Sequence, residues 1–147
     1  MKTNNFLSVL SGLGLLLLAG SGLGADLSSP VGDWKTIDDE TGKVKSIVTL
    51  WEENGRLYGK VKELLDPNAS RTCRNCEGEL KDAPIEGMRI LWDLRKEGDE
   101  WTKGTIFDPA KGKEYRSSLK LTDGGTKLEV TGHLFVFSRS QVWERVP

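Results

Sequence analysis

Two cysteines separated by two residues, Cys73 and Cys76, are the side chains of this chain whose type and spacing best suit chemistry. They lie in the segment SRTCRNCEGELKDAP, residues 70–84, and they are the only cysteines of the 147-residue sequence. Such a pair can form a disulfide, act as a thiol redox couple or supply half of a metal site. The flanking sequence and the compartment bear on the choice.

The residues after the pair favour the disulfide. A redox couple of this spacing usually sits where a strand gives way to a helix, whose N-terminus lowers the thiol pKa. The segment EGELKDAPIEG after Cys76 cannot make a convincing helix before Pro84. A zinc site needs four ligands, and the only histidine, His133, is distant in the sequence. We therefore expect a structural disulfide, with a redox couple and a metal site as the open alternatives, and we expect no metal and no cofactor.

The first 25 residues have the order of a secretory signal peptide. Lys2 is followed by an apolar run from Phe6 to Ala19, broken only by Ser and Gly, and then by small residues up to Ala25. We expect cleavage somewhere in residues 21–25, and an uncleaved N-terminal anchor is the alternative. We then expect an exported protein of the bacterial periplasm, with secretion as the alternative and no membrane span after cleavage. An oxidising compartment favours the disulfide.

The remaining residues, 26–147, have the length of one domain. The full chain has a formal net charge of −1 with 29% charged residues, and it contains no long basic block. This balance gives no support to a nucleic-acid partner. The sequence does not indicate an oligomeric state.

Short apolar or alternating segments, separated by turn signals such as ENG and DGG, predict an all-β fold. The alternation is clearest at Met88, Ile90, Trp92 and Leu94. The segment GKVKELLDP could begin a helix, but its glycine and proline leave little room. Antiparallel strands with short hairpins predict an up-and-down barrel, with an open sandwich of two sheets as the alternative. The eight expected strands are residues 31–37, 43–51, 56–65, 88–95, 100–107, 114–121, 126–134 and 138–146.

The two ends of the chain support closure of the barrel. The first expected strand contains Gly32-Asp33-Trp34, and the last contains Arg145. In a closed meander these strands pair, so the indole of Trp34 and the guanidinium of Arg145 could meet and close one end. Such a contact is worth about 0.5–2 kcal/mol. A Gly-x-Trp on the first strand with an arginine from the last strand across it resembles the signature of the lipocalin and fatty-acid-binding superfamily.

The chain as a whole resembles the bacterial exported domain-of-unknown-function family 2147. The resemblance rests on GDWKTIDDETGKVKSIVTLWEENGRLYGKVKELLDP, on Cys73-x-x-Cys76, on KDAPIEGMRILWDLRKEGDEWTKGTIFDPAKGKEYRSSLKL and on the terminal SQVWERV. It extends from about Pro30 to Val146. It implies an exported protein with an eight-stranded lipocalin-like, or calycin-like, barrel, and it implies no established reaction.

Other polar residues have a structural explanation that we prefer. Asp66-Pro67 and Asp108-Pro109 each follow the end of an apolar strand, where paired carboxylates could serve acid–base chemistry. Asp-Pro is also a standard turn opener, and we favour that interpretation. His133 has no paired nucleophile, and the serines at positions 138 and 140 lack the nucleophile-elbow motif. We therefore name no catalytic residue.

The aromatic side chains are the remaining candidates for a binding site. Core packing is their usual role, but some could line a ligand cavity. We predict a non-catalytic binder of a small apolar molecule or an envelope component. A protein-interaction or envelope stress or inhibitor module that uses the Cys73–Cys76 loop, and a thiol redox enzyme, stay open. The candidate lining residues are Trp51, Tyr58, Trp92, Trp101, Phe107 and Tyr115.

Overall fold

The computed structural model of this chain describes residue 24 and residues 26–147. The expected signal peptide, residues 1–25, therefore lies outside the described residues apart from Gly24. No helix within the described part is long and apolar enough to cross a membrane.

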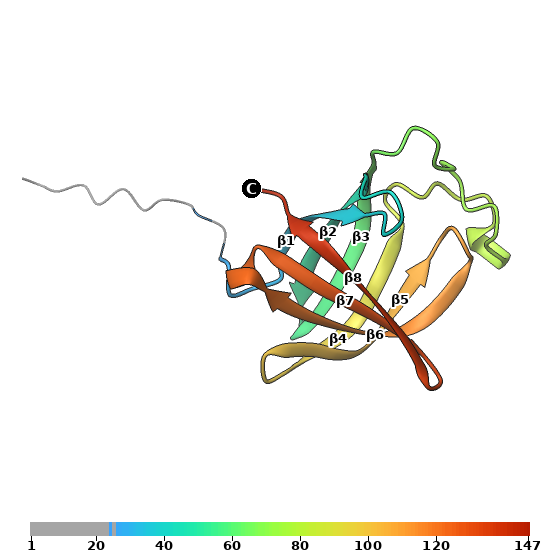
Figure 1. The fold of residues 1–147 in the computed structure, drawn as a ribbon. Coiled ribbons are helices and arrows are strands. Elements are labelled where there is room, and N and C mark those ends of the chain that lie inside the picture. Colours follow the sequence, from blue (N-terminus) through green and yellow to red (C-terminus); the bar gives the residue numbers. More distant parts are fainter. Residues whose placement is uncertain (1–23, 25) are drawn as a thin grey trace, which may run out of the picture.

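Eight antiparallel strands follow one another around a closed barrel (Figure 1). Each strand pairs with its neighbours in the sequence, and the first also pairs with the last. The predicted all-β up-and-down barrel is confirmed, and the sandwich alternative is wrong. The strands are β1 (Gly32–Ile37), β2 (Val44–Glu53), β3 (Arg56–Leu64), β4 (Arg89–Glu97), β5 (Glu100–Asp108), β6 (Lys113–Thr122), β7 (Lys127–Leu134) and β8 (Phe137–Arg145), with the short 3-10 turns η1 (Gly78–Leu80) and η2 (Asp123–Gly125).

Alternation along the strands builds the core. In β2 the inward residues Ser46, Val48 and Leu50 are buried, whereas the residues between them are partly exposed. In β7 the same pattern buries Leu128 and Val130. Successive side chains of a strand point to opposite faces, so one face of each strand fills the barrel and the other meets solvent. The segment GKVKELLDP belongs to β3 and its exit, so the helix considered for it does not form.

One end of the barrel is closed by Trp34 and Arg145. The two residues are register partners in the β1–β8 ladder, which otherwise contains only the pair of Lys35 with Glu144. The Arg145 Cζ atom lies 4.3 Å from the centre of the Trp34 ring, and the tryptophan is fully buried. The contact predicted from the sequence is therefore present, and it lies where the ladder that closes the barrel is shortest.

Backbone carbonyls before β1 and in η2 hold the same two side chains. The guanidinium of Arg145 donates to the carbonyl oxygens of Ser29 at 2.6 Å, Val31 at 3.1 Å and Gly125 at 2.8 Å. Trp34 Nε1 donates to the carbonyl oxygen of Pro30 at 2.8 Å. The segment that enters β1 is thereby tied across this end of the barrel.

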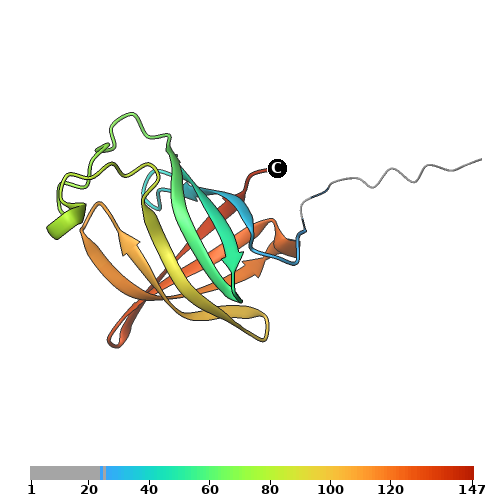
Figure 2. The ribbon, with the colours of Figure 1, turned by 180° about the vertical axis from the view of Figure 1, so that it is seen from behind.

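The opposite end carries four connections of unequal length. The β1–β2, β5–β6 and β7–β8 turns are short, whereas the β3–β4 connection, residues 65–88, is the long one and contains both cysteines (Figures 1 and 2). Between β1 and β8 the ladder is not continued toward this end. The barrel is therefore closed at its Trp34 end and open at the end where the long connection lies.

Candidate ligand-binding site

The interior of the barrel contains a cavity of about 710 Å³ that reaches the open end. Small-molecule sites in proteins commonly have about 300–1,000 Å³. The inner wall is apolar because the inward positions of the strands hold aliphatic side chains. These residues are Val48, Val61, Ile90, Ile106 and Val130.

The cavity also contains a buried hydrogen-bond donor. Trp143 lines the cavity and is 2% exposed, and its Nε1 has no hydrogen-bond partner among the described residues. A buried donor without a partner is costly, by about 1–3 kcal/mol. Two other polar groups of the wall, the hydroxyls of Thr36 and Ser46, are paired with each other, since their oxygens lie 2.7 Å apart. An acceptor on a bound molecule is one group that could satisfy Trp143.

Carboxylates at the mouth of the cavity hold turns. Asp66 and Asp108, the two residues that precede prolines, both line the mouth. Asp66 Oδ1 accepts from the backbone N–H of Asn68 at 2.9 Å, and Asp108 Oδ1 accepts from that of Ala110 at 3.0 Å. These bonds are those expected of turn openers, which supports the structural interpretation of both Asp-Pro pairs.

A third acid at the mouth, Asp38, is held in the same way. Its Oδ1 accepts hydrogen bonds from the backbone N–H and the hydroxyl of Thr41 and from the backbone N–H of Glu40. The bonds from Thr41 are the main reason that the pKa of Asp38 lies below its ordinary value. Cations also line the mouth, where Lys45, Arg74 and Lys111 have no ion-pair partner within 4.0 Å among the described residues. The mouth is therefore polar, in contrast to the inner wall.

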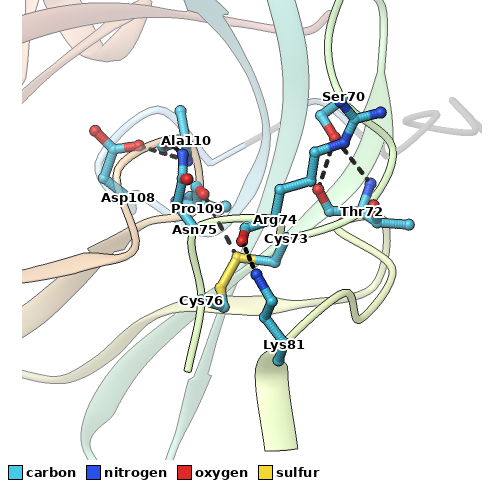
Figure 3. The surroundings of a disulfide bond; sticks show 10 residues. All are labelled: Ser70, Thr72, Cys73, Arg74, Asn75, Cys76, Lys81, Asp108, Pro109 and Ala110. Carbon is cyan, nitrogen blue, oxygen red and sulfur yellow. Dashed lines mark hydrogen bonds between the residues drawn. A yellow bond between two sulfur atoms is a disulfide. The ribbon is translucent and has the colours of Figure 1, made fainter. Parts of the chain in front are cut away.

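The long β3–β4 connection forms part of this mouth, and a disulfide between Cys73 and Cys76 fixes its shape (Figure 3). The backbone N–H of Cys73 donates to the carbonyl of Ala83 at 2.8 Å, and that of Asp82 donates to the carbonyl of Cys73 at 3.0 Å. Residues 70, 72, 74 and 75 of the connection line the cavity. The disulfide thus shapes a segment that borders the opening.

The disulfide loop is docked on the β5–β6 turn. Asn75 Nδ2 donates to the carbonyl oxygen of Ala110 at 2.6 Å, and Cys73 Sγ lies 3.4 Å from the carbonyl oxygen of Pro109 (Figure 3). Gly112 in this turn has a φ of +64°, and a Cβ there would lie 1.9 Å from the Asn75 carbonyl oxygen. Only glycine permits this close approach. The loop and the turn therefore form one continuous part of the rim.

The burial of the two sulfurs bears on the redox alternative. Cys73 is 0% and Cys76 is 3% exposed. Reactive cysteines sit in partly exposed, electropositive surroundings because exchange requires access to a sulfur. The geometry is that of a structural disulfide. Among the described residues there is no group of three or more His, Cys, Asp or Glu side chains placed to hold a metal ion.

Two of the six aromatic residues expected to line a cavity lie on its wall. They are Phe107 and Tyr115, from β5 and β6. Trp101 is 6% exposed and packs in the core without lining the cavity. Its position shows that an inward aromatic side chain can pack entirely within the core and leave no surface to the cavity.

The other three aromatic residues lie outside the barrel. Trp51 follows the inward Leu50 and therefore points outward, where its ring stacks on Tyr58 with centroids 5.8 Å apart. The guanidinium carbon of Arg89 lies 5.0 Å from the centre of the Tyr58 ring. Tyr58 and Trp92 border a shallow outer depression between β4 and the long connection. The prediction that these three line the interior cavity does not match their positions.

Some residues of the site were not identified from the sequence. Trp143, Gln141 and Arg139 alternate along β8 and all line the cavity. This alternation could have been found in the sequence. The expected contact of Arg145 with Trp34 shows which face of the last strand points inward, and Trp143, two residues earlier, lies on the same face. His133 lies one residue beyond the inward Gly132, and its Nε2 is 3.1 Å from the hydroxyl oxygen of Ser118. We find no role for it in the cavity.

Comparison with known proteins assigns the chain to a family. The family described as "Uncharacterized protein conserved in bacteria (DUF2147)" matches residues 32–145, which is the span from the first residue of β1 to the last of β8. The chain belongs to DUF2147. The resemblance predicted from the sequence motifs is thereby confirmed. A comparison with curated protein sequences finds no match.

A solved structure has the same architecture as this DUF2147 protein. The structure described as "Protein HP1028 from the human pathogen Helicobacter pylori belongs to the lipocalin family" superposes with a TM-score of 0.71 at 21% identity, covering 81% of this chain and 84% of that one. This similarity shows a lipocalin-like fold. A second structure, secretory abundant heat soluble protein 4 from Ramazzottius varieornatus, gives a TM-score of 0.44 at 14% identity and covers 80% of this chain and 94% of that one.

Proposed function

We propose that this DUF2147 protein is an exported, non-catalytic binding protein that holds a small, largely apolar molecule or envelope component inside its barrel. The observation that carries the proposal is the cavity of about 710 Å³, which has an aliphatic inner wall and a polar mouth. Burial of apolar ligand surface in such a wall is favourable by about 25 cal/mol per Å². The ligand therefore enters with its apolar part first.

The buried donor refines the class of ligand. Among the described residues, Trp143 Nε1 is the buried side-chain polar atom of the cavity lining without a hydrogen-bond partner, so a ligand with an acceptor near its inner end satisfies it. The mouth offers Lys45, Arg74 and Lys111 to a polar group at the outer end. The ligand class is therefore an apolar molecule with an acceptor within it and a polar end at the opening.

Export is part of the proposal. The N-terminal 25 residues have the order of a signal peptide, and the Cys73–Cys76 disulfide suits an oxidising compartment. We propose that residues 26–147 form the single exported domain. Mass spectrometry of the protein recovered from the bacterial cell envelope reads its first residue. A start within residues 22–26 supports the proposal, and a retained Met1 contradicts it.

The cavity can be filled without disturbing the backbone, which gives a direct test. Gly132 lies on the cavity wall, and a Cβ there would meet only Tyr115 at 3.6 Å and more distant atoms, which is ordinary van der Waals contact. Gly132→Leu therefore places a side chain inside the cavity. Thr131→Leu, one residue earlier, adds the same side chain on the outer face and is the matched control.

The assay measures binding of a fluorescent fatty-acid probe, together with native mass spectrometry of the protein taken from cells. We expect the wild type and Thr131→Leu to bind the probe, and Gly132→Leu to bind it at least about tenfold more weakly because apolar contact area is lost. Far-UV circular dichroism checks that both variants fold. Equal affinity of all three proteins, or absence of any retained molecule and of probe binding in the wild type, would contradict the proposal.

A further inference from the structure

The tip of the β7–β8 hairpin is the most exposed apolar segment of the described chain. Leu134 is 46%, Phe135 96%, Val136 90% and Phe137 75% exposed. The hairpin projects from the open end of the barrel in both views (Figures 1 and 2). Four consecutive apolar residues held in water at a protruding tip are not required by the fold, since the core is complete without them. They indicate an interaction surface, which we call the apolar tip.

The backbone presents these side chains outward. Leu134 and Phe137 are register partners in the last row of the β7–β8 ladder, so Phe135 and Val136 form the two-residue turn between them. Phe135 adopts a φ of +54°, a conformation that glycine or asparagine would adopt with less strain. A phenyl group at this position is unfavourable for the free turn. Its presence needs an explanation outside the folding of the hairpin.

The apolar tip adjoins the mouth of the cavity. Leu134 and Phe137, the base of the tip, belong to the cavity wall, together with Ser138 and Arg139 directly behind them. A path of apolar contact therefore runs from the tip into the barrel.

The first rows behind the tip are polar and basic. His133 pairs with Ser138 on one side and with Arg116 on the other, and Arg139 follows in β8. Arg139 is 64% exposed and its Nη2 lies 2.8 Å from Asp39 Oδ2. An apolar end followed at once by basic and polar side chains matches the order of acyl chains and phosphate groups at the surface of a bilayer.

The size of the tip argues against a second copy of the chain as its partner. With about 150–250 Å² for a large buried side chain, the four residues offer roughly 600 Å². A stable interface buries about 800 Å² on each partner and uses some 20–30 residues. The acyl-chain region of a lipid bilayer can accommodate a convex apolar tip of this size without a complementary groove.

We propose that the apolar tip docks this protein onto a lipid bilayer, with Phe135 and Val136 inserted among the acyl chains and the cavity mouth facing the membrane surface. This inference goes beyond the proposed binding function and does not depend on it. A protein with a filled cavity would still dock.

Flotation of the purified protein with vesicles of phosphatidylethanolamine and phosphatidylglycerol tests the proposal. The N-terminal residue is first read by mass spectrometry, because a retained apolar run at residues 6–19 would itself bind lipid. We expect the wild type to float with the vesicles and Phe135→Asn combined with Val136→Ser to bind at least tenfold more weakly. Asparagine suits the positive φ, so this variant keeps the turn.

Two further variants make the outcome decisive. Leu27→Ser removes a leucine that is 45% exposed near the closed end and should float like the wild type. Gly132→Leu should also float, even when it no longer binds a probe in the cavity. The proposal is overturned if the wild type does not float, if the tip variant floats equally well, or if sedimentation velocity shows a dimer that the tip variant dissociates.

Discussion

Replacement of Arg145 should strongly destabilise the protein, because this side chain stabilises the β1–β8 pairing, which is the shortest ladder of the barrel. Its guanidinium donates to three backbone carbonyls and lies 4.3 Å from the centre of the Trp34 ring. Burial lowers the pKa of Arg145 below its ordinary value, but a guanidinium remains charged at neutral pH. Arg145→Met keeps an apolar stem over the indole and removes the three hydrogen bonds and the charge.

The expected loss follows from these contacts. A hydrogen bond from a charged group contributes a net of about 1.5–3 kcal/mol, and a cation–π contact adds about 1 kcal/mol. Relief of the buried charge and hydration of the freed carbonyls offset part of the sum. We expect Arg145→Met to lower the free energy of unfolding by about 4 kcal/mol, and the melting temperature by about 15 °C for a domain of this size. Arg145→Lys keeps the positive charge but not the planar set of N–H donors, and it should lower the free energy of unfolding by about half as much.

Urea denaturation followed by circular dichroism measures these losses. Arg139→Met is the matched control, because Arg139 lies on the same strand but is 64% exposed and forms one ion pair with Asp39. An exposed pair of this kind contributes about 1 kcal/mol or less. If Arg145→Met costs no more than Arg139→Met, the guanidinium does not secure the closed end and the reasoning is refuted.

Two further predictions concern the disulfide at the mouth and the stability in acid. The double substitution Cys73→Ser and Cys76→Ser removes the cross-link of a very small loop, and chain entropy predicts that the free energy of unfolding in urea falls by about 2 kcal/mol. A loss near zero would show that the docked loop keeps its shape without the cross-link. Burial raises the pKa of Asp33, but hydrogen bonds from Lys62 and Thr49 outweigh it and leave the pKa below its ordinary value. The wild type should therefore lose this stabilisation as the pH falls below about 4. In thermal melts at graded pH, the melting temperature of Asp33→Asn should fall less steeply with decreasing pH than that of the wild type. Equal slopes for the two proteins would contradict the lowered pKa of Asp33.

The sequence is sufficient for the architecture because the relevant information is local. The alternation of apolar residues and the turn signals between them depend on neighbours in the chain, so eight strands can be counted from the residues alone. The contact of Trp34 with Arg145 is also predictable, since closure of a meander brings its first and last strands together. The spacing of Cys73 and Cys76 limits them to few geometries, and their disulfide is formed.

The lining of the cavity is not local information. The inward face of a strand depends on its register, and the ladders of this barrel shift at several points, for example between Ile47 and Val48 in β2 and between Leu57 and Gly59 in β3. A shift of one residue moves a side chain from the interior to the surface. In the β3–β4 ladder such a shift brings both Leu91 and Leu94 to the inner face and leaves Trp92 outside. Trp51 and Tyr58 lie outside because they alternate with the inward Leu50 and Leu57, although their residue types suit a ligand site.

The sequence by itself therefore indicated the β-meander and its family and limited Cys73 and Cys76 to a few arrangements, because each depends on the order of residues along the chain. Only the tertiary structure decided that the interior contains a cavity, that Trp143 presents an unpaired donor to it, and that Phe135 and Val136 stand exposed beside its mouth. These features depend on which side chains from distant strands meet and how completely they fill the space between them. Packing of this kind has no signature in a single segment of sequence.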